Sequence, residues 1–397
     1  MTEEQPRGWV SLKPRREITV SRGHPWIFSG AIAKTSDGLA TGAIVEVRTA
    51  SGARIGSGLY AGAGSIAVKV FGFGAEELDA ELIRRRLRRA VELRRALGLL
   101  SNPETNGCRL VHGEGDGLPG VVIDWYAGAA VIQLHLEGIA PFLPVISDTL
   151  AEVQATDSLH TICVHQLGNE GESERSLLVG DQTAGVIREG GIQYSVDWMR
   201  GQKTGFFLDQ RDARRVVRER TPRRASCLNL FSYTGGFTMA LLKGGAERVL
   251  SVDSSPLALE LLDKTAALNG YGLGHAPTVC SDVFRFLGED RERYSMVVAD
   301  PPAFAKHQKS LERGIRGYER LAELAVDRVA PGGMLAVFSC SQAVSRERLW
   351  QALQVGVGRA RRSAQVIGSF SQASCHPVAL AHPEGEYLKG FLLMIAG

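Results

Sequence analysis

A carboxylate and a thiol each follow an apolar, strand-like run in the second half of the chain. Residues 296–299 lead into Asp300, and residues 334–338 lead into a short polar run that contains Cys340. Ligands of open parallel sheets bind at the carboxyl ends of the strands. A carboxylate there can hydrogen-bond the Watson–Crick edge of a base. A thiol there can be a nucleophile once a cation or the site activates it, although such a cysteine is more often a small buried apolar group.

The loop after Asp300 is expected to be rigid. Pro301 and Pro302 stop the strand and stiffen the chain beyond it. Phe304 follows closely and can stack on a base. We therefore interpret the loop as part of a ligand site rather than as a plain turn.

A glycine turn lies upstream of these residues. The apolar run 227–231 enters Gly235 and Gly236, and a helical pattern follows. Glycines are needed there because a side chain would keep the backbone away from a ligand, although a tight turn without a ligand has the same pattern. The spacing is not GxGxxG, which disfavours a plain dinucleotide fold. Asp253, 17 residues after Gly236, ends the next strand and can accept hydrogen bonds from ribose hydroxyls.

A third acidic residue follows the next strand. Asp282 comes after the apolar run 277–280, where it can accept from an adenine amino group, and Phe284 can cover the ring. Taken alone, Asp282 is more often a helix N-cap. As the third member of an ordered set it favours the ligand role. The set predicts an adenosine cofactor without pyrophosphate, and hence a class I methyltransferase that uses S-adenosyl-L-methionine.

After residue 200 the sequence repeats a pattern of strand, glycine turn and helix, and these elements must position the residues above. The pattern predicts a mostly parallel, doubly wound, Rossmann-like α/β domain over residues 198–397. Alternating apolar residues between glycines predict a small β-domain over residues 1–75. The pattern of residues 76–197 predicts a small α+β domain that begins with a helix rich in arginine. These arginines could follow phosphates or form a solvated helix face, and we favour the solvated face.

Composition narrows the functional classes further. The 397 residues have a net charge of +3 and six scattered cysteines with no CxxC pair, so no metal site is expected. No apolar run is long enough to span a membrane, and residues 1–6 lack the apolar segment of a signal peptide. The cytoplasm is therefore the expected compartment.

Six segments together resemble the ribosomal RNA cytosine-C5 methyltransferases that carry an N-terminal PUA domain. The resemblance covers nearly the whole chain, and these segments match its motifs in order: 22–28, 203–211, 229–236, 300–304, 338–341 and 382–390. It implies that residues 1–75 form a PUA-like RNA-binding domain and that the substrate is large-subunit ribosomal RNA, free or in assembling subunits. Basic side chains in small β-domains suit recognition of RNA by shape and backbone charge.

The resemblance also implies roles for the chemical residues. Cys340 would attack C6 of cytosine, which makes C5 nucleophilic enough to accept a methyl group. A base would then remove the C5 proton and the thiolate would leave, while Asp300 holds the pyrimidine edge. Other cytosine-C5 RNA methyltransferases place a second cysteine where this chain has Pro302. The base is therefore not identified from the sequence.

We expect three groups of site residues. The catalytic pair is Cys340 and Asp300. The cofactor residues are expected to be Phe207, Asp209, Arg211, Asn229, Phe231, Ser232, Tyr233, Thr234, Gly235, Gly236, Asp253, Ser254, Asn269, Asp282, Val283, Asp300 and Pro301. The RNA-binding residues are expected to be Lys13, Arg22, Trp26, Lys203, Phe304 and Lys306.

Other interpretations stay open at this point. An aromatic residue after Asp300-Pro301-Pro302 is also found in enzymes that methylate exocyclic amino groups such as guanine N2. That chemistry needs no thiol. An RNA-binding or ribosome-assembly factor without activity is a second alternative, against which the glycines and the three acids argue. A small-molecule methyltransferase would leave the first two domains without a role. The sequence does not settle which nucleotide is modified or whether the chain forms a homodimer.

Overall fold

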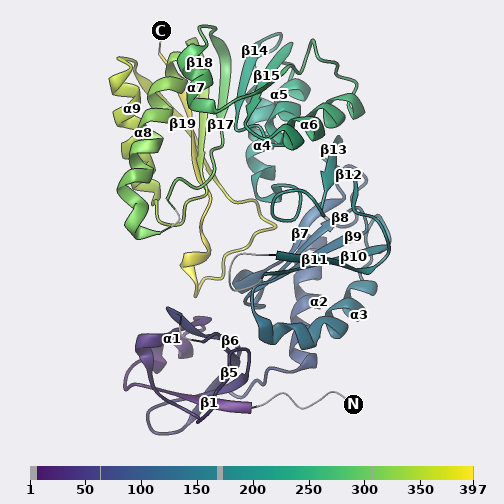
Figure 1. Ribbon diagram of the computed structural model, residues 1–397, viewed down its shortest axis with the longest axis vertical. Helices are drawn as coiled ribbons and strands as arrows, with labels where there is room; N and C mark the ends of the chain where they lie inside the picture. The colour runs from purple at the N-terminus through teal and green to yellow at the C-terminus, as the bar shows by residue number, and fades with distance from the viewer. Residues whose placement is uncertain (1–6, 63, 168–172, 306, 397) are drawn as a thin grey trace. The chain divides into compact units, whose positions relative to one another are not determined.

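The computed structural model describes residues 7–62, 64–167, 173–305 and 307–396 (Figure 1). They form two compact units. The first unit contains the chain up to Thr183 together with Cys375–Gly385. The second contains Ala184–Ser374 together with Glu386–Gly397.

The first unit begins with a six-stranded sheet, which confirms the predicted small β-domain. The strand order is β2-β6-β5-β4-β1-β3. Alternate valines of β4 and β6 point inward and are fully buried, because successive strand residues face opposite sides of a sheet. The strands of this sheet are β1 (Arg7–Leu12), β2 (Trp26–Phe28), β3 (Ile32–Thr35), β4 (Ile44–Arg48), β5 (Arg54–Tyr60) and β6 (Ile66–Phe73), and helix α1 (Glu17–Ser21) lies between β1 and β2 in the sequence.

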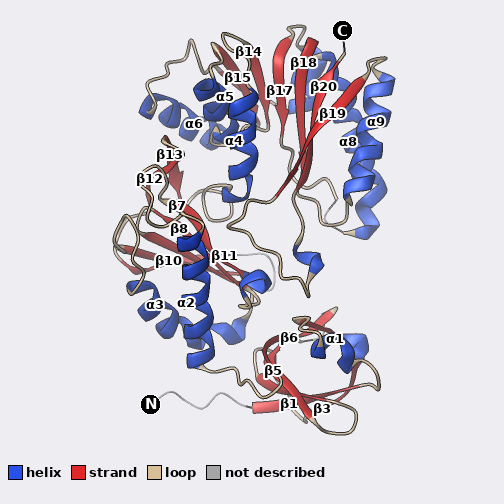
Figure 2. Cartoon of the chain, turned by 180° about the vertical axis from the view of Figure 1, so that it is seen from behind, coloured by secondary structure: helices blue, strands red, loops and turns tan. Residues whose placement is uncertain are grey.

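A second sheet of the first unit has five strands in the order β11-β10-β9-β8-β7. Two helices accompany it, α2 (Ala80–Ala96) and α3 (Leu143–Ala151), and these contact each other (Figure 2). The strands are β7 (Gly107–His112), β8 (Val121–Tyr126), β9 (Ala129–Leu134), β10 (Thr161–Leu167) and β11 (Ser173–Val179). This is the α+β arrangement that the sequence predicts.

The arginines of α2 do not all face solvent as expected. Arg94 is fully buried, donates two hydrogen bonds to Asp116 at 2.5 and 2.8 Å, and donates another to the carbonyl oxygen of Cys375 at 2.7 Å. The prediction was wrong for this residue because its partners are distant in sequence. Arg88, in contrast, forms a half-exposed pair with Glu152.

A hairpin opens the second unit, although the sequence suggested that it would close the middle domain. It consists of β12 (Ala184–Glu189) and β13 (Ile192–Asp197). The backbone amides of Gln193 and Ser195 on β13 donate to Asn269, which follows helix α6 (Pro256–Leu268), and to Thr265 within that helix. These bonds explain why the hairpin belongs there.

The second unit contains a seven-stranded sheet in the order β16-β15-β14-β17-β18-β20-β19. The first five strands are parallel, and β20 is antiparallel to both of its neighbours. The strands are β14 (Ser226–Leu230), β15 (Arg248–Asp253), β16 (Thr278–Cys280), β17 (Tyr294–Ala299), β18 (Val329–Ser339), β19 (Ala364–Ser371) and β20 (Lys389–Ile395). The predicted doubly wound domain is confirmed.

Helices cover both faces of this sheet (Figures 1 and 2). One face packs its aliphatic side chains against α7, α8 and α9 in a continuous core. On the opposite face Asn229 donates to Thr238 at 2.8 Å, and Thr238 lies 2.8 Å from Ser251, which joins β14 and β15 to α5. The helices are α4 (Arg211–Arg220), α5 (Gly236–Gly244), α6 (Pro256–Leu268), α7 (Val283–Glu289), α8 (Leu311–Asp327) and α9 (Arg346–Arg359).

Over the described part of the chain, none of the helices has both the length and the apolar character needed to cross a membrane.

Candidate active site

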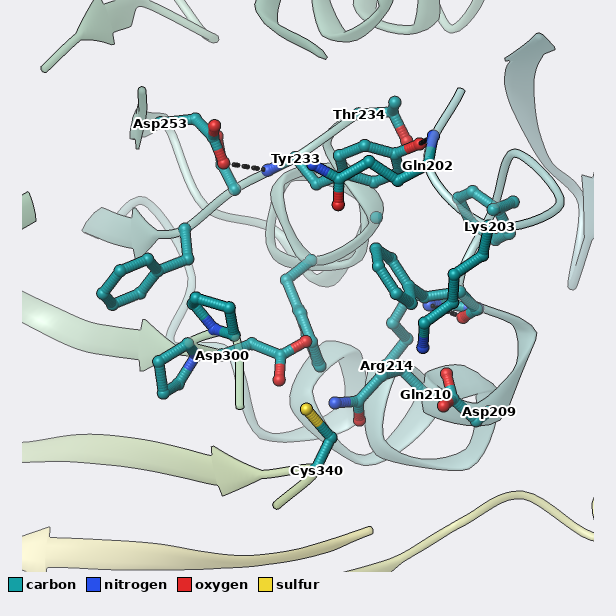
Figure 3. A pocket seen from close by; sticks show the side chains of 18 of the residues that line it. Gln202, Lys203, Asp209, Gln210, Arg214, Tyr233, Thr234, Asp253, Asp300 and Cys340 are labelled. Atoms are coloured by element: carbon teal, nitrogen blue, oxygen red, sulfur yellow. Dashed lines mark hydrogen bonds between the residues drawn. The ribbon is translucent and has the colours of Figure 1, made fainter. Parts of the chain in front are cut away.

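A pocket in the second unit lies beyond the carboxyl ends of β14, β15, β17 and β18, as expected for a parallel sheet (Figure 3). Its wall brings together residues that are far apart in the sequence, from Gln202 to Leu388. The predicted site residues among them are Lys203, Phe207, Asp209, Phe231, Ser232, Tyr233, Thr234, Gly236, Asp253, Ser254, Asp300, Pro301 and Cys340.

The turn between β14 and α5 is tightly constrained. Gly235 has a φ of +86°, and a Cβ atom there would lie 2.7 Å from Cγ of Leu262. Phe231 and Tyr233 also have positive φ, which is uncommon for residues other than glycine and occurs often at functional sites. Glycine is therefore required at position 235, and the turn brings its backbone against the pocket.

Two hydroxyl groups of this turn have no internal partner. The Oγ of Ser232 and the Oγ1 of Thr234 are buried and make no hydrogen bond, although both residues line the pocket. A buried polar group without a partner costs about 1–3 kcal/mol. This cost is relieved when a polar ligand enters the turn.

Asp253 holds the turn in place while keeping capacity for a ligand. Its Oδ2 accepts from the backbone N–H of Tyr233 at 2.9 Å, and its Oδ1 accepts from the N–H of Ser255 at 2.9 Å (Figure 3). Each carboxylate oxygen has two lone pairs, so each can accept one more hydrogen bond. The residue is therefore placed as predicted, at the end of β15 facing the pocket.

A buried ion pair supports the opposite wall. Arg214 on α4 donates to both carboxylate oxygens of Glu189 at 2.6 and 2.8 Å, and to the carbonyl oxygen of Phe207 at 2.9 Å. Arg211 donates to the same carboxylate at 3.2 Å. Burial alone would raise the pKa of Glu189, but Arg214 and then Arg211 outweigh it and keep the pKa below its usual range.

Asp300 and Cys340 occupy neighbouring strand ends and face the same cavity (Figure 3). Burial, and then the charge of Asp209, raises the pKa of Asp300 to about 7. Burial, and then the charge of Asp300, raises the pKa of Cys340 to about 11, while Lys203 lowers it. A carboxyl that is partly protonated near neutral pH can donate a hydrogen bond as well as accept one.

The loop that carries Cys340 is fixed by a buried lysine. The ammonium group of Lys389 on β20 donates to the carbonyl oxygens of Ser341 and Val344 at 2.8 and 2.6 Å. The hydroxyl of Ser341 lies 3.1 Å from that of Tyr318 and accepts from the N–H of Ala305 at 3.3 Å. The thiol is thus held on a rigid support.

Asp209 is bonded to both ends of the connection between β19 and β20. Its Oδ2 accepts from the hydroxyl of Tyr387 at 2.6 Å, and its backbone carbonyl oxygen accepts from the N–H of Ala373 at 2.9 Å. Its Oδ1 is buried without a hydrogen-bond partner. The predicted residue therefore does face the pocket, with one oxygen still available.

Some predicted cofactor residues lie outside the pocket wall. Asn269 follows the last residue of α6, and its side-chain amide hydrogen-bonds three backbone groups of β13 and α6. Asn229 is buried in the polar network beneath the turn, and Arg211 is engaged with Glu189. These three residues support the wall from behind, and Gly235 shapes the turn without lining the cavity.

Asp282 acts as the N-cap of α7. Its carboxylate accepts from the N–H of Arg285 at 2.9 Å, and its side chain is exposed. Val283 is buried in the core beside it. The structure thus shows the capping role that the sequence also allowed. The adenine contact stays a prediction for both residues.

Phe304 is half-buried against the core and is not part of the pocket wall. Its ring lies 4.8 Å from that of Tyr318 and 6.0 Å from that of Phe284. A Cβ atom on Gly317 would lie 2.9 Å from its ring, so the helix approaches it closely. Phe304 stiffens the proline loop from within, whereas Lys306, also predicted for RNA, lies outside the described residues.

The RNA residues predicted in the first unit differ in their surroundings. Lys13 and Arg22 are exposed, and Lys13 donates to the carbonyl oxygen of Gly30 at 2.8 Å. Trp26 is half-buried: its indole donates to Glu114 at 2.8 Å, and its ring contacts that of His382 at 4.3 Å. Trp26 therefore has an internal structural role, while the two cations stay accessible.

Several wall residues were missed by the sequence reasoning: Gln202, Phe206, Gln210, Arg214, Phe237, Pro302 and Leu388. Gln210 was within reach, because it belongs to the motif at 203–211 that the resemblance identified. Arg214 carried no local signal, since its partner Glu189 comes from another element.

The wall suits an adenosine cofactor. Unpartnered hydroxyls on Ser232 and Thr234 line one end, and Asp253 offers free lone pairs for ribose hydroxyls. Asp300 and Cys340 mark the other end, where a reacting base would sit. Within the described ranges no cluster of histidine, cysteine and acidic side chains could hold a metal ion.

This fold and site define the S-adenosylmethionine-dependent methyltransferases, and the chain belongs to that family. The family model described by that name matches residues 108–353, and a PUA-like domain matches residues 10–73. Over nearly its whole length the chain also belongs with a named group of these enzymes, the ribosomal RNA large subunit methyltransferase I proteins.

It is 36% identical over 395 residues to the protein of that name from Aeromonas salmonicida, covering 97% of this chain and 98% of that one. It is 37% identical over 395 residues to the protein from Aeromonas hydrophila, with the same coverage. Among solved structures, a SAM-dependent methyltransferase from Streptococcus mutans matches with a TM-score of 0.84 at 19% identity, over 97% of this chain and 99% of that one. A methyltransferase complexed with SAH matches with a TM-score of 0.83 at 20% identity, over 98% and 99% of the two chains. At such identities the structures show the fold alone.

Proposed function

We propose that the chain transfers a methyl group from S-adenosylmethionine to C5 of a cytosine in large-subunit ribosomal RNA, through a covalent adduct with Cys340. The observation that carries this proposal is the placement of the Cys340 thiol and the Asp300 carboxyl on adjacent strand ends, in one pocket with the glycine turn (Figure 3). The relatives' name supplies the RNA class, and we expect the cytoplasm to be the site of action.

Binding of the cofactor is assigned to the wall around the turn. Ser232, Thr234 and Asp253 would hold its polar groups, and Phe207 and Tyr233 would flank it. When bound, the cofactor supplies an electrophilic methyl group on a positively charged sulfur. The exposed cations Lys13 and Arg22 of the first unit would contact RNA phosphates.

The chemistry begins with loss of the Cys340 proton to solvent. The thiolate adds to C6 of the cytosine, and the electrons of the C5–C6 double bond move toward N3, which the protonated carboxyl of Asp300 stabilises. C5 would then take the methyl group that the bound cofactor supplies, and the electrons of the broken bond would stay with the donor sulfur. Loss of the C5 proton restores the C5–C6 double bond, and the bond from C6 to the thiolate breaks.

Burial places both groups in suitable states for this sequence. The pKa of about 7 leaves much of Asp300 protonated at neutral pH, whereas the pKa of about 11 keeps the thiol protonated at rest. A resting thiol is protected from oxidation, since the thiolate is the reactive form. Activation must therefore accompany loading of the site, where Lys203 already favours the thiolate.

Trapping with modified RNA tests the proposal. Large-subunit rRNA transcribed with 5-fluorocytidine cannot lose a proton from C5, so the wild-type chain should form a complex that survives denaturing electrophoresis. Cys340→Ala should form none and should not methylate unmodified transcript. Cys280→Ser removes an exposed cysteine and should behave as wild type.

The outcome also decides between chemistries. If Cys340→Ala still methylates the transcript, the C5 mechanism is wrong, and transfer to an exocyclic amine such as guanine N2 takes its place. If neither protein methylates but both bind the RNA, the chain is a binding or assembly factor.

A further inference from the structure

Gln210 presents an unused hydrogen-bonding group at the chemical end of the pocket. It ends the 3-10 turn Leu208–Gln210, directly before α4, and its side chain is only 3% exposed. It lines the same cavity as Asp300 and Cys340. Its Oε1 is buried and has no hydrogen-bond partner.

The other end of the same amide is engaged. The amide nitrogen of Gln210 faces Asp300, and this interaction opposes the rise in the pKa of that carboxyl (Figure 3). Because the Oε1 of Gln210 has no partner, the amide NH2 is the group turned to Asp300, and the oxygen is left over. Figure 3 shows the amide head beside the Asp300 carboxylate and the Cys340 thiol.

Asp209 also carries an unpartnered oxygen, but its position differs. Its other oxygen is bound by Tyr387, and Figure 3 places its carboxylate beside Lys203 rather than beside Cys340. Gln210 is therefore the uncharged group best placed against the base that Cys340 attacks.

The Watson–Crick edges of the two pyrimidines differ at this position. Cytosine presents an amino donor at C4 beside an acceptor at N3, whereas uracil presents an acceptor at C4 beside a donor at N3. A protonated Asp300 suits the N3 acceptor of cytosine. An amide oxygen next to it suits the amino group and would face the O4 oxygen of uracil unfavourably.

We propose that the Oε1 of Gln210 accepts a hydrogen bond from the exocyclic amine of the target cytosine and thereby selects cytosine over uracil. This inference rests on the proposed function, because it requires a pyrimidine at Cys340. Sites built around buried hydrogen-bonding groups reject a ligand that leaves those groups unpaired. The neutral amide also suits its surroundings, since a third carboxylate beside Asp209 and Asp300 would add repulsion.

The test compares two trapping substrates. Transcripts of large-subunit rRNA are made with either 5-fluorocytidine or 5-fluorouridine, and the rate of covalent complex formation is measured for each. Wild type should strongly prefer the fluorocytidine transcript. Gln210→Leu keeps the volume of the side chain but removes the acceptor. The ratio of its trapping rate with fluorocytidine RNA to that with fluorouridine RNA should therefore fall by about 10- to 100-fold. Gln210→Glu keeps an acceptor and should retain the preference for cytosine.

A matched control comes from Gln202, which lines the cofactor end of the same pocket. Gln202→Leu makes the same chemical change and should leave the ratio of the two rates unchanged, whatever happens to the rates themselves. Calorimetric binding of S-adenosylhomocysteine checks that each variant is folded. If Gln210→Leu fails this check, Gln210→Asn is used instead. It shortens the side chain by one methylene, which moves the amide away from the base, and its rate ratio should fall in the same way.

The outcomes separate this inference from the function beneath it. If wild type traps fluorocytidine RNA and Gln210→Leu keeps the wild-type ratio, the role of Gln210 is wrong and the C5 mechanism stands. If wild type forms no complex with fluorocytidine RNA, the C5 mechanism itself fails. A narrowed ratio in Gln210→Leu with an unchanged ratio in Gln202→Leu supports the inference.

Discussion

Replacing Glu189 by glutamine should severely destabilise the second unit. The glutamine keeps the shape of the side chain but removes the charge that Arg214 and Arg211 share at distances of 2.6 to 3.2 Å. Breaking one partner out of a buried ion pair leaves an uncompensated charge and costs about 3–5 kcal/mol. The side chains of Glu189 and Arg214 are only 8% and 4% exposed, so solvent offers little relief.

Urea unfolding of the full chain measures this cost. The transition of the second unit is identified as the one that S-adenosylhomocysteine shifts, since a ligand of the native state stabilises it by mass action. With a typical slope of about 2 kcal/mol per molar urea, the midpoint of Glu189→Gln should fall by roughly 2 M. Cofactor affinity should fall with it, because Arg214 also holds the carbonyl oxygen of Phe207 in the pocket wall.

The matched control is Glu219→Gln, which breaks an exposed pair with Arg215 on the same helix. Exposed pairs of this kind contribute about 0.3–0.5 kcal/mol, so the midpoint should barely move. The pKa of Glu189 is lowered in the folded protein, so its contribution is complete above the unfolded pKa of about 4.3 and is lost only in stronger acid. If Glu189→Gln at pH 7 loses no more stability than Glu219→Gln, the buried pair does not support the site.

Three further changes have defined outcomes. Gly235→Ala should weaken binding of S-adenosylhomocysteine by tenfold or more and lower the Tm, because position 235 has a φ of +86° and no room for a Cβ atom. At Gly274 a Cβ atom would meet no atom within 4 Å, so Gly274→Ala should change neither quantity in the same calorimetry. Arg94→Met should lower the free energy of unfolding of the first unit by about 3–5 kcal/mol in urea, because it leaves the buried Asp116 without its partner. The half-exposed Arg88→Met should change it by less than about 1 kcal/mol, and equal losses would contradict the role of the buried Arg94 pair. The value of kcat/KM should rise about tenfold per pH unit below pH 7, because the thiolate fraction of Cys340 increases. Above pH 7 it should level off, because Asp300 with its pKa of about 7 loses its proton. Asp300→Asn should lack this break, and a wild-type profile without a break would refute the role of the protonated carboxyl.

The sequence predicted most of what depends on local pattern. The doubly wound sheet follows from strand, glycine and helix repeats, and Asp253 and Asp300 lie at strand ends as expected. Parallel strands bring their carboxyl ends to one edge, so residues far apart in the chain could be assigned to one pocket in advance.

What the sequence missed depends on long-range pairing. Arg94 and Arg214 belong to helices with several arginines in similar local patterns, yet each of the two is buried and pairs with a carboxylate of another element. Nothing in the local pattern distinguishes such an arginine from an exposed one. Phe304 shows another limit of the local pattern: it is half-buried and its ring packs against Tyr318 and Phe284, so its stacking on a base stays a prediction.

The segment Cys375–Gly385 has a consequence for synthesis of the protein. It belongs to the first unit, although the chain on both sides of it belongs to the second. The carbonyl oxygen of Cys375 is a buried partner of Arg94, 281 residues earlier. The ribosome therefore makes the N-terminal part long before its last piece exists, and must complete nearly all of the second unit in between. On this order of events the unit that begins first stays incomplete until residue 385 has been made. A chaperone that binds the growing chain would meet it without this segment, and a product truncated before residue 375 would lack the segment altogether.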